Sequence, residues 1–277
     1  MRKIIKYFCI FAVLLIILHS CSKKDAKLAI VQLNAELEIT EIENNIFLVT
    51  HSFPWPGNSL IVLMDKKNIL WIDTPYTPEA TISVLNWIEK KFGEQSSITE
   101  INTGFHIDNL GGNQELAIRN IPIYGSDLTC ELLETRSKTT MSNMIGWLNG
   151  EKNKKYRDVY SNLSLYKPSI TFNINEEQKV LVGSNEVIIY YPGPTHTYDN
   201  LVVYIPSQEI LFGGCMILSA NTEKVGFIED GNLDEWSKSL TNLQERFDNI
   251  RIIVPGHGNP GDSTLIAHTK GIVDASK

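Results

Sequence analysis

Cysteine is scarce in this sequence. Four cysteines occur in 277 residues, at positions 9, 21, 130 and 215, which is too few for the disulfide framework that stabilises small secreted domains. Basic residues are outnumbered as well, with 25 Lys and Arg against 32 Asp and Glu, so the formal net charge is −7. No basic stripe with interleaved aromatic residues occurs. A chain of this charge repels phosphate backbones, and we therefore expect no nucleic-acid partner.

Long apolar runs are absent except near the start of the chain. Residues 8–18 are apolar and follow a basic start formed by Arg2, Lys3 and Lys6. A helix that spans a bilayer needs about 20 apolar residues, so this run is too short to cross and has the pattern of an export signal. We predict that residues 1–20 are a signal peptide and that the protein acts in the cell envelope, on the periplasmic side.

Cys21 follows this segment directly, after a Leu-His-Ser triplet. A cysteine placed after Leu-x-small resembles the bacterial lipobox, whose cysteine is lipidated after cleavage. This resemblance implies a lipid at Cys21 and a membrane contact through that lipid. His19 is bulkier than the usual residue there, so plain secretion remains the alternative. We assign residues 21–39 to a lipidated tether and residues 40–277 to one folded domain.

The remaining chain has the composition of a folded domain, with 43% hydrophobic and 21% charged residues. Short β-branched runs bounded by turn residues predict strands, and longer stretches with one apolar face predict helices. Strands are predicted at 46–49, 60–63, 69–72, 98–102, 170–172, 180–182, 187–191, 201–205, 210–212 and 251–254, and helices at 78–92, 111–119, 232–247 and 263–273. This order favours two sheets enclosed by outer helices. Residues 138–167 have the weakest pattern and are predicted to be a surface excursion.

Capping residues mark two of these helices. Thr77 followed by Pro78 suits the start of the first helix, and Gly93 suits its end. Asn232, with Glu235 three residues later, resembles a capping box at the start of the third. The positions of these helices are therefore predicted more sharply than those of the others.

Five potential metal ligands stand at turn-like positions. They are His106, Asp108, His196, Cys215 and His257, each placed where an apolar run gives way to glycine, proline or asparagine. Imidazole, thiolate and carboxylate together form the ligand set of zinc. Because the donors are dispersed and mixed, they indicate an open, catalytic site. A lone His-x-Asp pair is more often a structural hydrogen-bonded pair, so the prediction rests on all five residues together.

Short motifs surround these ligands and continue between them. They are Asn58-Ser59-Leu60, Trp71-Ile72-Asp73-Thr74-Pro75-Tyr76, His106-x-Asp108-Asn109 with Gly111-Gly112, Thr195-His196-Thr197-x-Asp199-Asn200, Gly213-Gly214-Cys215 and Pro255-Gly256-His257-Gly258. With these motifs, over about residues 40–270, the chain resembles the class B beta-lactamases, the metallo-beta-lactamases, of the branch with a cysteine ligand. The resemblance implies an α/β (α+β) four-layer αββα sandwich with zinc at one edge of the sheets, and hydrolysis of the strained β-lactam amide.

The resemblance also divides the five ligands into two sites. Asp108, Cys215 and His257 correspond to one zinc site of the family. His106 and His196 correspond to two of the three histidines of the other.

The chain departs from the family at the third histidine and at substrate-binding positions. Gly104 stands where the third histidine is usual, Leu218 where a lysine binds the substrate carboxylate, and Phe227 where an asparagine polarises the lactam carbonyl. Asn109 stands where many relatives have arginine, and Lys224 is near enough in sequence to replace the missing cation. One branch of the family has asparagine in place of the third histidine and works with a single zinc. We therefore expect one tightly bound zinc, with a second only at high metal concentration.

These residues suggest roles in catalysis. In a site with one zinc, His106 and His196 are free to orient or deprotonate a water, and Asp108 is an alternative base. Trp55, Asn109 and Lys224 are predicted to contact the substrate. For Trp55 the alternative is an exposed hairpin tip that serves packing only.

Two other functions stay open. One is hydrolysis of another ester, thioester or lactone on the same fold, because fold alone does not fix the substrate. The other is a non-catalytic zinc-binding envelope lipoprotein, which the absent third histidine would suit. In each case we expect a monomer.

Overall fold

The computed structural model describes residues 28–277. The predicted signal peptide and Cys21 lie outside the described residues. Within residues 28–277, no helix combines the length and apolar composition needed to cross a bilayer.

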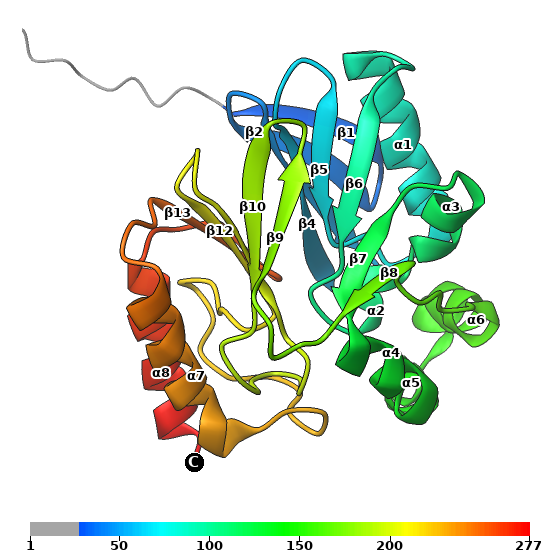
Figure 1. Cartoon of the computed structure of the whole chain (residues 1–277). Helices are drawn as coiled ribbons and strands as arrows, with labels where there is room; N and C mark the ends of the chain where they lie inside the picture. Colours follow the sequence, from blue (N-terminus) through cyan, green and yellow to red (C-terminus); the bar gives the residue numbers. More distant parts are fainter. Residues whose placement is uncertain (1–27) are drawn as a thin grey trace, which may run out of the picture.

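Two sheets lie face to face and helices cover their outer faces (Figure 1). In hydrogen-bonded order, the first sheet has β1 (Ala29–Asn34), β2 (Leu37–Glu43), β3 (Ile46–Ser52), β4 (Pro56–Leu63), β5 (Asn68–Ile72), β6 (Ser97–Ile101), β7 (Ile123–Ser126) and β8 (Ile170–Phe172). The second has β13 (Ile252–Pro255), β12 (Ile210–Gly214), β11 (Val202–Ile205), β10 (Asn185–Tyr190) and β9 (Gln178–Val182). The helices are α1 (Pro78–Phe92), α2 (Ile107–Leu110), α3 (Asn113–Ile118), α4 (Asp127–Thr135), α5 (Ser137–Trp147), α6 (Lys154–Asn162), α7 (Leu233–Arg246) and α8 (Thr264–Ala275), with a 3₁₀ turn at Glu151–Asn153.

The alternation of side chains along each strand builds the layers. In β5, Leu70 and Ile72 face the other sheet, while Trp71 faces the layer of α1 and α3. In β12, Phe212 belongs to the core between the sheets and Leu211 to the core against α7 and α8. The four-layer αββα sandwich expected from the sequence is therefore confirmed.

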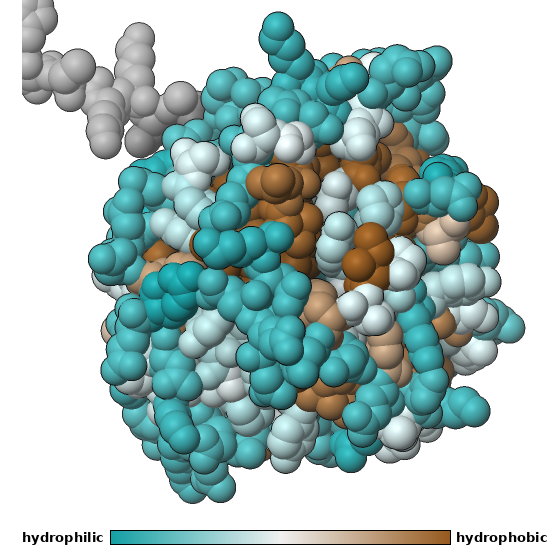
Figure 2. Space-filling view, in the orientation of Figure 1, coloured by the Kyte–Doolittle hydropathy of each residue, from teal (hydrophilic) through white to brown (hydrophobic). Residues whose placement is uncertain are grey.

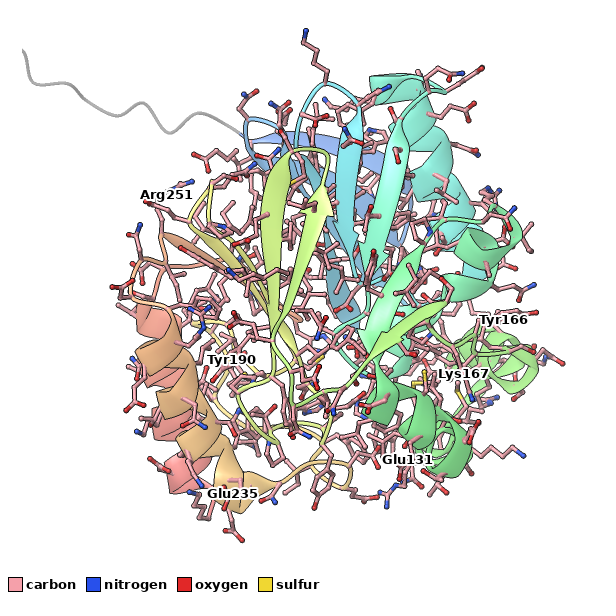
Figure 3. All side chains as sticks on the ribbon, viewed as in Figure 1. Glu131, Tyr166, Lys167, Tyr190, Glu235 and Arg251 are labelled. Carbon is pink, nitrogen blue, oxygen red and sulfur yellow. The ribbon has the colours of Figure 1, made fainter. Side chains whose placement is uncertain are left out.

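The surface follows from the same layering. On the face shown in Figure 2, hydrophilic side chains cover α7 and α8 at the lower left, and hydrophobic side chains gather over the strands in the upper middle. The charged side chains of Glu131, Lys167 and Arg251 point outward into solvent (Figure 3).

The predicted capping residues act as expected. The Thr77 side chain accepts a hydrogen bond from the backbone N–H of Ala80 at 3.2 Å, and α1 ends before Gly93, whose φ is 95°. The Asn232 side chain accepts from the backbone N–H of Glu235 at 3.1 Å. These local signals therefore fix the first turns of α1 and α7.

The region 138–167, which was predicted to be a surface excursion, is mostly helical. It contains most of α5, the 3₁₀ turn and α6. No helix was predicted at α5 because this helix buries only Met144 and has no side-chain cap, so its sequence has no apolar stripe. Its place depends instead on a small cluster in which Met144 packs with Tyr76, Ile107 and Tyr160.

The folded domain also begins earlier than residue 40. Strand β1 and the start of β2 fall within the segment 21–39 that was assigned to a tether, and the two strands pair in antiparallel register. Leu37 and Ile39 of β2 are buried in the core beneath α1. The residues of β1 are almost all exposed, which is why this strand had no visible pattern.

Candidate metal centre

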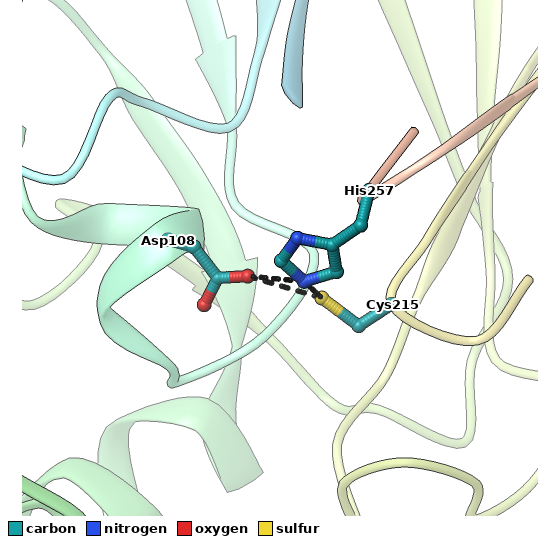
Figure 4. A group of neighbouring side chains, drawn as sticks. All are labelled: Asp108, Cys215 and His257. Carbon is teal, nitrogen blue, oxygen red and sulfur yellow. Dashed lines mark hydrogen bonds and ion pairs between the residues drawn. The ribbon is translucent and has the colours of Figure 1, made fainter. Parts of the chain in front are cut away.

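Three of the predicted ligands converge on one point (Figure 4). Asp108 comes from α2, Cys215 follows β12, and His257 follows β13. The Asp108 Oδ2 atom lies 3.3 Å from Cys215 Sγ and 3.1 Å from His257 Nε2, and the sulfur lies 3.6 Å from that nitrogen. One ligand atom from each residue therefore lies within 4.8 Å of the others, as a shared cation requires.

The sheet brings Cys215 and His257 together because β12 and β13 are parallel neighbours and end at the same edge. Gly256 is needed for this approach, since a Cβ there would lie 2.8 Å from the Cys215 nitrogen and 3.0 Å from its sulfur. His257 Nδ1 lies 2.7 Å from the Pro56 carbonyl oxygen. A carbonyl only accepts, so Nδ1 carries a proton, and Nε2, which faces Asp108, is the nitrogen that can bind a metal once it has lost its own proton.

The charges of this cluster also suit a cation. Burial alone would raise the pKa of Asp108, but the hydrogen bond and charge of His257, the charge of His106 and the hydrogen bond from Cys215 together outweigh burial and hold that pKa well below its usual range. Burial, and after it the Asp108 carboxylate, raise the pKa of the Cys215 thiol well above its usual value. A divalent cation among these atoms would reverse the effect on the thiol. Sulfur, nitrogen and oxygen donors at these distances therefore fit zinc.

His106 and His196 form a separate pair beside this cluster. Their ring centroids lie 5.2 Å apart with an interplanar angle of 88°. Burial, and after it the charge of His106, lower the pKa of His196 to about 3. His196 is therefore neutral near pH 7, with a nitrogen lone pair available for a hydrogen bond or a metal.

No third protein donor completes the histidine pair at Gly104. The direction in which its side chain would point is lined by two amide atoms, with an ideal Cβ 3.1 Å from Asn200 Nδ2 and 3.2 Å from Asn109 Oδ1. Both atoms are buried and have no hydrogen-bond partner within residues 28–277. The pair thus offers two imidazoles, one donor fewer than a three-histidine site.

Asp230 belongs to the site, although no motif in the sequence marked it. Its Oδ2 lies 3.1 Å from His106 Nε2 and accepts from Thr140 Oγ1 at 2.6 Å, while its Oδ1 accepts from Arg136 at 2.6 Å. Although burial opposes it, the hydrogen bond with His106 leads the contacts that hold the pKa of Asp230 well below its usual range. An ionised Asp230 fixes the His106 ring with its other nitrogen, Nδ1, free.

Asn109, which was predicted to contact the substrate, is not among the residues that line the pocket described below. It is buried, and its Nδ2 donates to Asp73 Oδ2 at 2.9 Å and to Thr103 Oγ1 at 3.2 Å. Because α2 turns by about 100° per residue, presenting Asp108 to the site directs its neighbour into the protein interior. Asp73 likewise bonds to Thr103 and Asn109 and to none of the ligand histidines.

A pocket of about 590 Å³ opens above these residues. Trp55 and Lys224 line it, and so do Leu218 and Phe227. All five predicted metal ligands reach this pocket. The other lining residues are Tyr76, Ile107, Thr140, Met144, Trp147, Ile217, Ser219, Thr222, Val225 and Gly226.

Comparison with known proteins extends the similarity beyond the motifs. A family model described as the metallo-beta-lactamase superfamily matches residues 54–257. The chain is 30% identical over 253 residues to a metallo-beta-lactamase type 2 of Bacillus sp. (strain 170), covering 90% of this chain and 86% of that protein. For the protein of the same name from Bacillus cereus, the identity is 30% over 238 residues, with 84% and 81% covered. A crystal structure of the DIM-1 metallo-beta-lactamase exposed to ceftazidime superposes with a TM-score of 0.70 at 30% identity, covering 87% of this chain and 98% of that one.

Proposed function

The chain belongs to the metallo-beta-lactamase superfamily, and on that basis we propose that it hydrolyses the amide bond of β-lactams with one zinc ion held by Asp108, Cys215 and His257. Membership of the family implies a divalent metal, typically zinc. The observation that carries the proposal is the convergence of one carboxylate oxygen, one sulfur and one imidazole nitrogen within 4.8 Å of one another. These donors line the same pocket as both remaining histidines.

The chain's own side chains then divide the chemistry. Zinc in such a site supplies stabilisation for the negative charge that develops as the lactam C–N bond breaks. His106 and His196 are placed to orient the attacking water or to take its proton. Asp108 is the alternative acceptor, because its carboxylate is ionised. Asp230 positions His106 through the hydrogen bond that it accepts from His106 Nε2.

Lys224 is our choice for the partner of the substrate carboxylate. Leu218 cannot play that part, and Lys224 lines the same pocket with the hydroxyl-bearing Ser219 and Thr222. Within residues 28–277, no acidic oxygen lies within 4.0 Å of the Lys224 amine, so this cation has no competing ion pair. Trp55, in the connection between β3 and β4, supplies an apolar surface of the same pocket.

Metal analysis and activity assays test the proposed function together. We expect the purified chain to retain one zinc after dialysis and to hydrolyse at least one of a penicillin, a cephalosporin and a carbapenem. The physical reason for a single ion is that the histidine pair lacks a third protein donor at Gly104. Enzyme treated with a chelator is the control.

Each alternative outcome has a distinct meaning. Two tightly held ions per chain would contradict the single-ion site while leaving the activity in place. If the purified chain binds zinc but hydrolyses none of the three β-lactams, the ester, thioester or lactone hydrolase is favoured. The reason is that Leu218 and Phe227 line the pocket at the positions where the resemblance implies substrate-binding polar residues. A chain that binds zinc and hydrolyses neither lactams nor esters would be the non-catalytic lipoprotein.

We also propose that the enzyme is anchored in the cell envelope, as a monomer facing the periplasm, through a lipid on Cys21. The support is the export pattern of residues 1–20 and the lipobox-like triplet before Cys21. Cys21→Ser should move the protein from the membrane fraction to the soluble fraction, because within residues 28–277 no helix is long and apolar enough to serve as an anchor across the bilayer. Cys130→Ser is the control, and an unchanged distribution of Cys21→Ser would contradict the lipid anchor.

A further inference from the structure

Helix α5 supplies a wall of the pocket that the ligand motifs do not reveal. Its last residue, Trp147, packs edge-on against Phe227 of the loop after β12, with ring centroids 5.1 Å apart at 65°. Trp55 of the β3–β4 connection approaches Trp147 from a third segment, at 6.4 Å and 80°. These three residues, which we call the aromatic wall, all line the pocket above the metal centre.

The aromatic wall is connected directly to the catalytic groups. The Phe227 ring lies 5.9 Å from the His106 ring and 6.5 Å from the His196 ring. The Trp147 ring contacts the Phe227 ring in turn, with centroids 5.1 Å apart. A ligand held at the histidines can therefore extend along Phe227 to Trp147.

Polar contacts hold α5 in this position. Asn143 Nδ2 donates to Glu229 Oε2 at 3.0 Å, and Thr140 Oγ1 donates to Asp230 Oδ2 at 2.6 Å. Arg136, just before the helix, donates to Asp230 Oδ1 at 2.6 Å. Since Asp230 also bonds to His106, the wall and the catalytic histidine are held at a fixed separation.

The exposure of the wall indicates an apolar occupant. Trp147 is 50% exposed and Trp55 is 39% exposed, so two indole faces stand in water at the rim of a mostly apolar pocket. Exposed aromatic surface of this kind marks ligand-binding grooves, and aromatic rings prefer edge-to-face or offset contact with another ring. In the proposed function, Lys224 pairs with the carboxylate of the ligand. The aromatic wall is then available to an uncharged group of the same ligand.

We propose that the aromatic wall, with Trp147 at its centre, binds an aromatic acyl substituent on the amine next to the lactam ring and makes the enzyme prefer substrates that carry one. This inference rests on the proposed function and names the class of substrate for it. Trp147 is a specificity-determining residue here, since it contacts the substituent and not the bond that breaks.

Two penicillins with the same nucleus test the wall. Benzylpenicillin carries a phenylacetyl group, and 6-aminopenicillanic acid has a free amine instead. Trp147→Ala should raise KM for benzylpenicillin about five- to tenfold, the usual effect of truncating an aromatic anchor at a contact, and change KM for 6-aminopenicillanic acid less than about twofold. Trp147→Phe should retain most of the preference. Tyr166→Ala, which removes a ring that is 42% exposed and outside the pocket, should change neither value.

Equal changes for the two penicillins, or none, would overturn the proposal. Turnover of 6-aminopenicillanic acid by the wild type establishes the lactamase independently, so a failure of the wall is distinct from a failure of the proposed function. A binding titration with hydrolysed benzylpenicillin provides a second measurement that needs no turnover. If the wild type and Trp147→Ala bind this product equally, the wall does not hold the acyl group, whatever the activity.

Discussion

Cys215→Ser should lose the tightly bound zinc and should lower kcat/KM for β-lactams by at least about a thousandfold. Substitution of residues that only support a metal ligand commonly costs 10- to 100-fold in affinity or activity, and Cys215 itself supplies a donor atom. Its sulfur lies within 3.6 Å of both other donors. A serine hydroxyl is a harder, neutral donor that does not replace a thiolate on zinc at neutral pH.

Zinc content after dialysis and kcat/KM with added zinc measure this effect. Cys130→Ser is the matched control, because Cys130 is the other free cysteine within residues 28–277 and lies on α4, outside the pocket. Retention of one tight zinc and wild-type turnover by Cys215→Ser would contradict the assignment of the metal centre. A circular dichroism spectrum like that of the wild type would exclude misfolding as the cause.

Asp230→Ala is expected to lower kcat about 10- to 100-fold while the tight zinc stays bound. The substitution leaves the buried His106 Nε2–H without its acceptor, so the ring loses its fixed orientation. It also removes the acceptor of Thr140 and Arg136, and so breaks two of the contacts that join α5 and the residue before it to the loop after β12. KM should change less than kcat if the main loss is the position of His106.

A conservative variant separates positioning from general damage. Asp230→Asn keeps an oxygen that can accept from His106, so it should recover most of the lost kcat. Asp234→Ala, in the exposed first turn of α7, is the control for removal of one acidic residue. If Asp230→Asn is as impaired as Asp230→Ala, orientation by this hydrogen bond is not the role of Asp230. Loss of the tight zinc in Asp230→Ala would point instead to a structural role for the residue.

The layers and the first turns of two helices could be predicted from sequence because their causes are local. Strands β5 and β12 bury side chains on both faces, so each appears in the sequence as a short apolar run bounded by turn residues. Thr77 and Asn232 cap helices within three residues of their own positions. Signals of this kind depend only on neighbouring residues, so they can be recognised in the sequence without the structure.

The candidate site was predictable for a different reason. Its donors stand in short loops after strands. The resemblance to a known family was sufficient to assign Asp108, Cys215 and His257 to one site from the sequence alone. The structure brings these three together, and whether they bind zinc remains the prediction that Cys215→Ser tests. Trp55 and Lys224 lie on the pocket, and their contact with substrate is likewise a prediction.

What the sequence by itself determined is therefore the architecture and the chemical types gathered at one edge of the sheets. Only the tertiary structure decided that Asn109 faces inward, that Asp230 supports His106, and that α5 forms a wall of the pocket. The physical reason is that each of these depends on a partner far away in the chain. Asp230 is separated from His106 by 124 positions, and α5 buries so little of its own surface that its place is set by the loop it contacts.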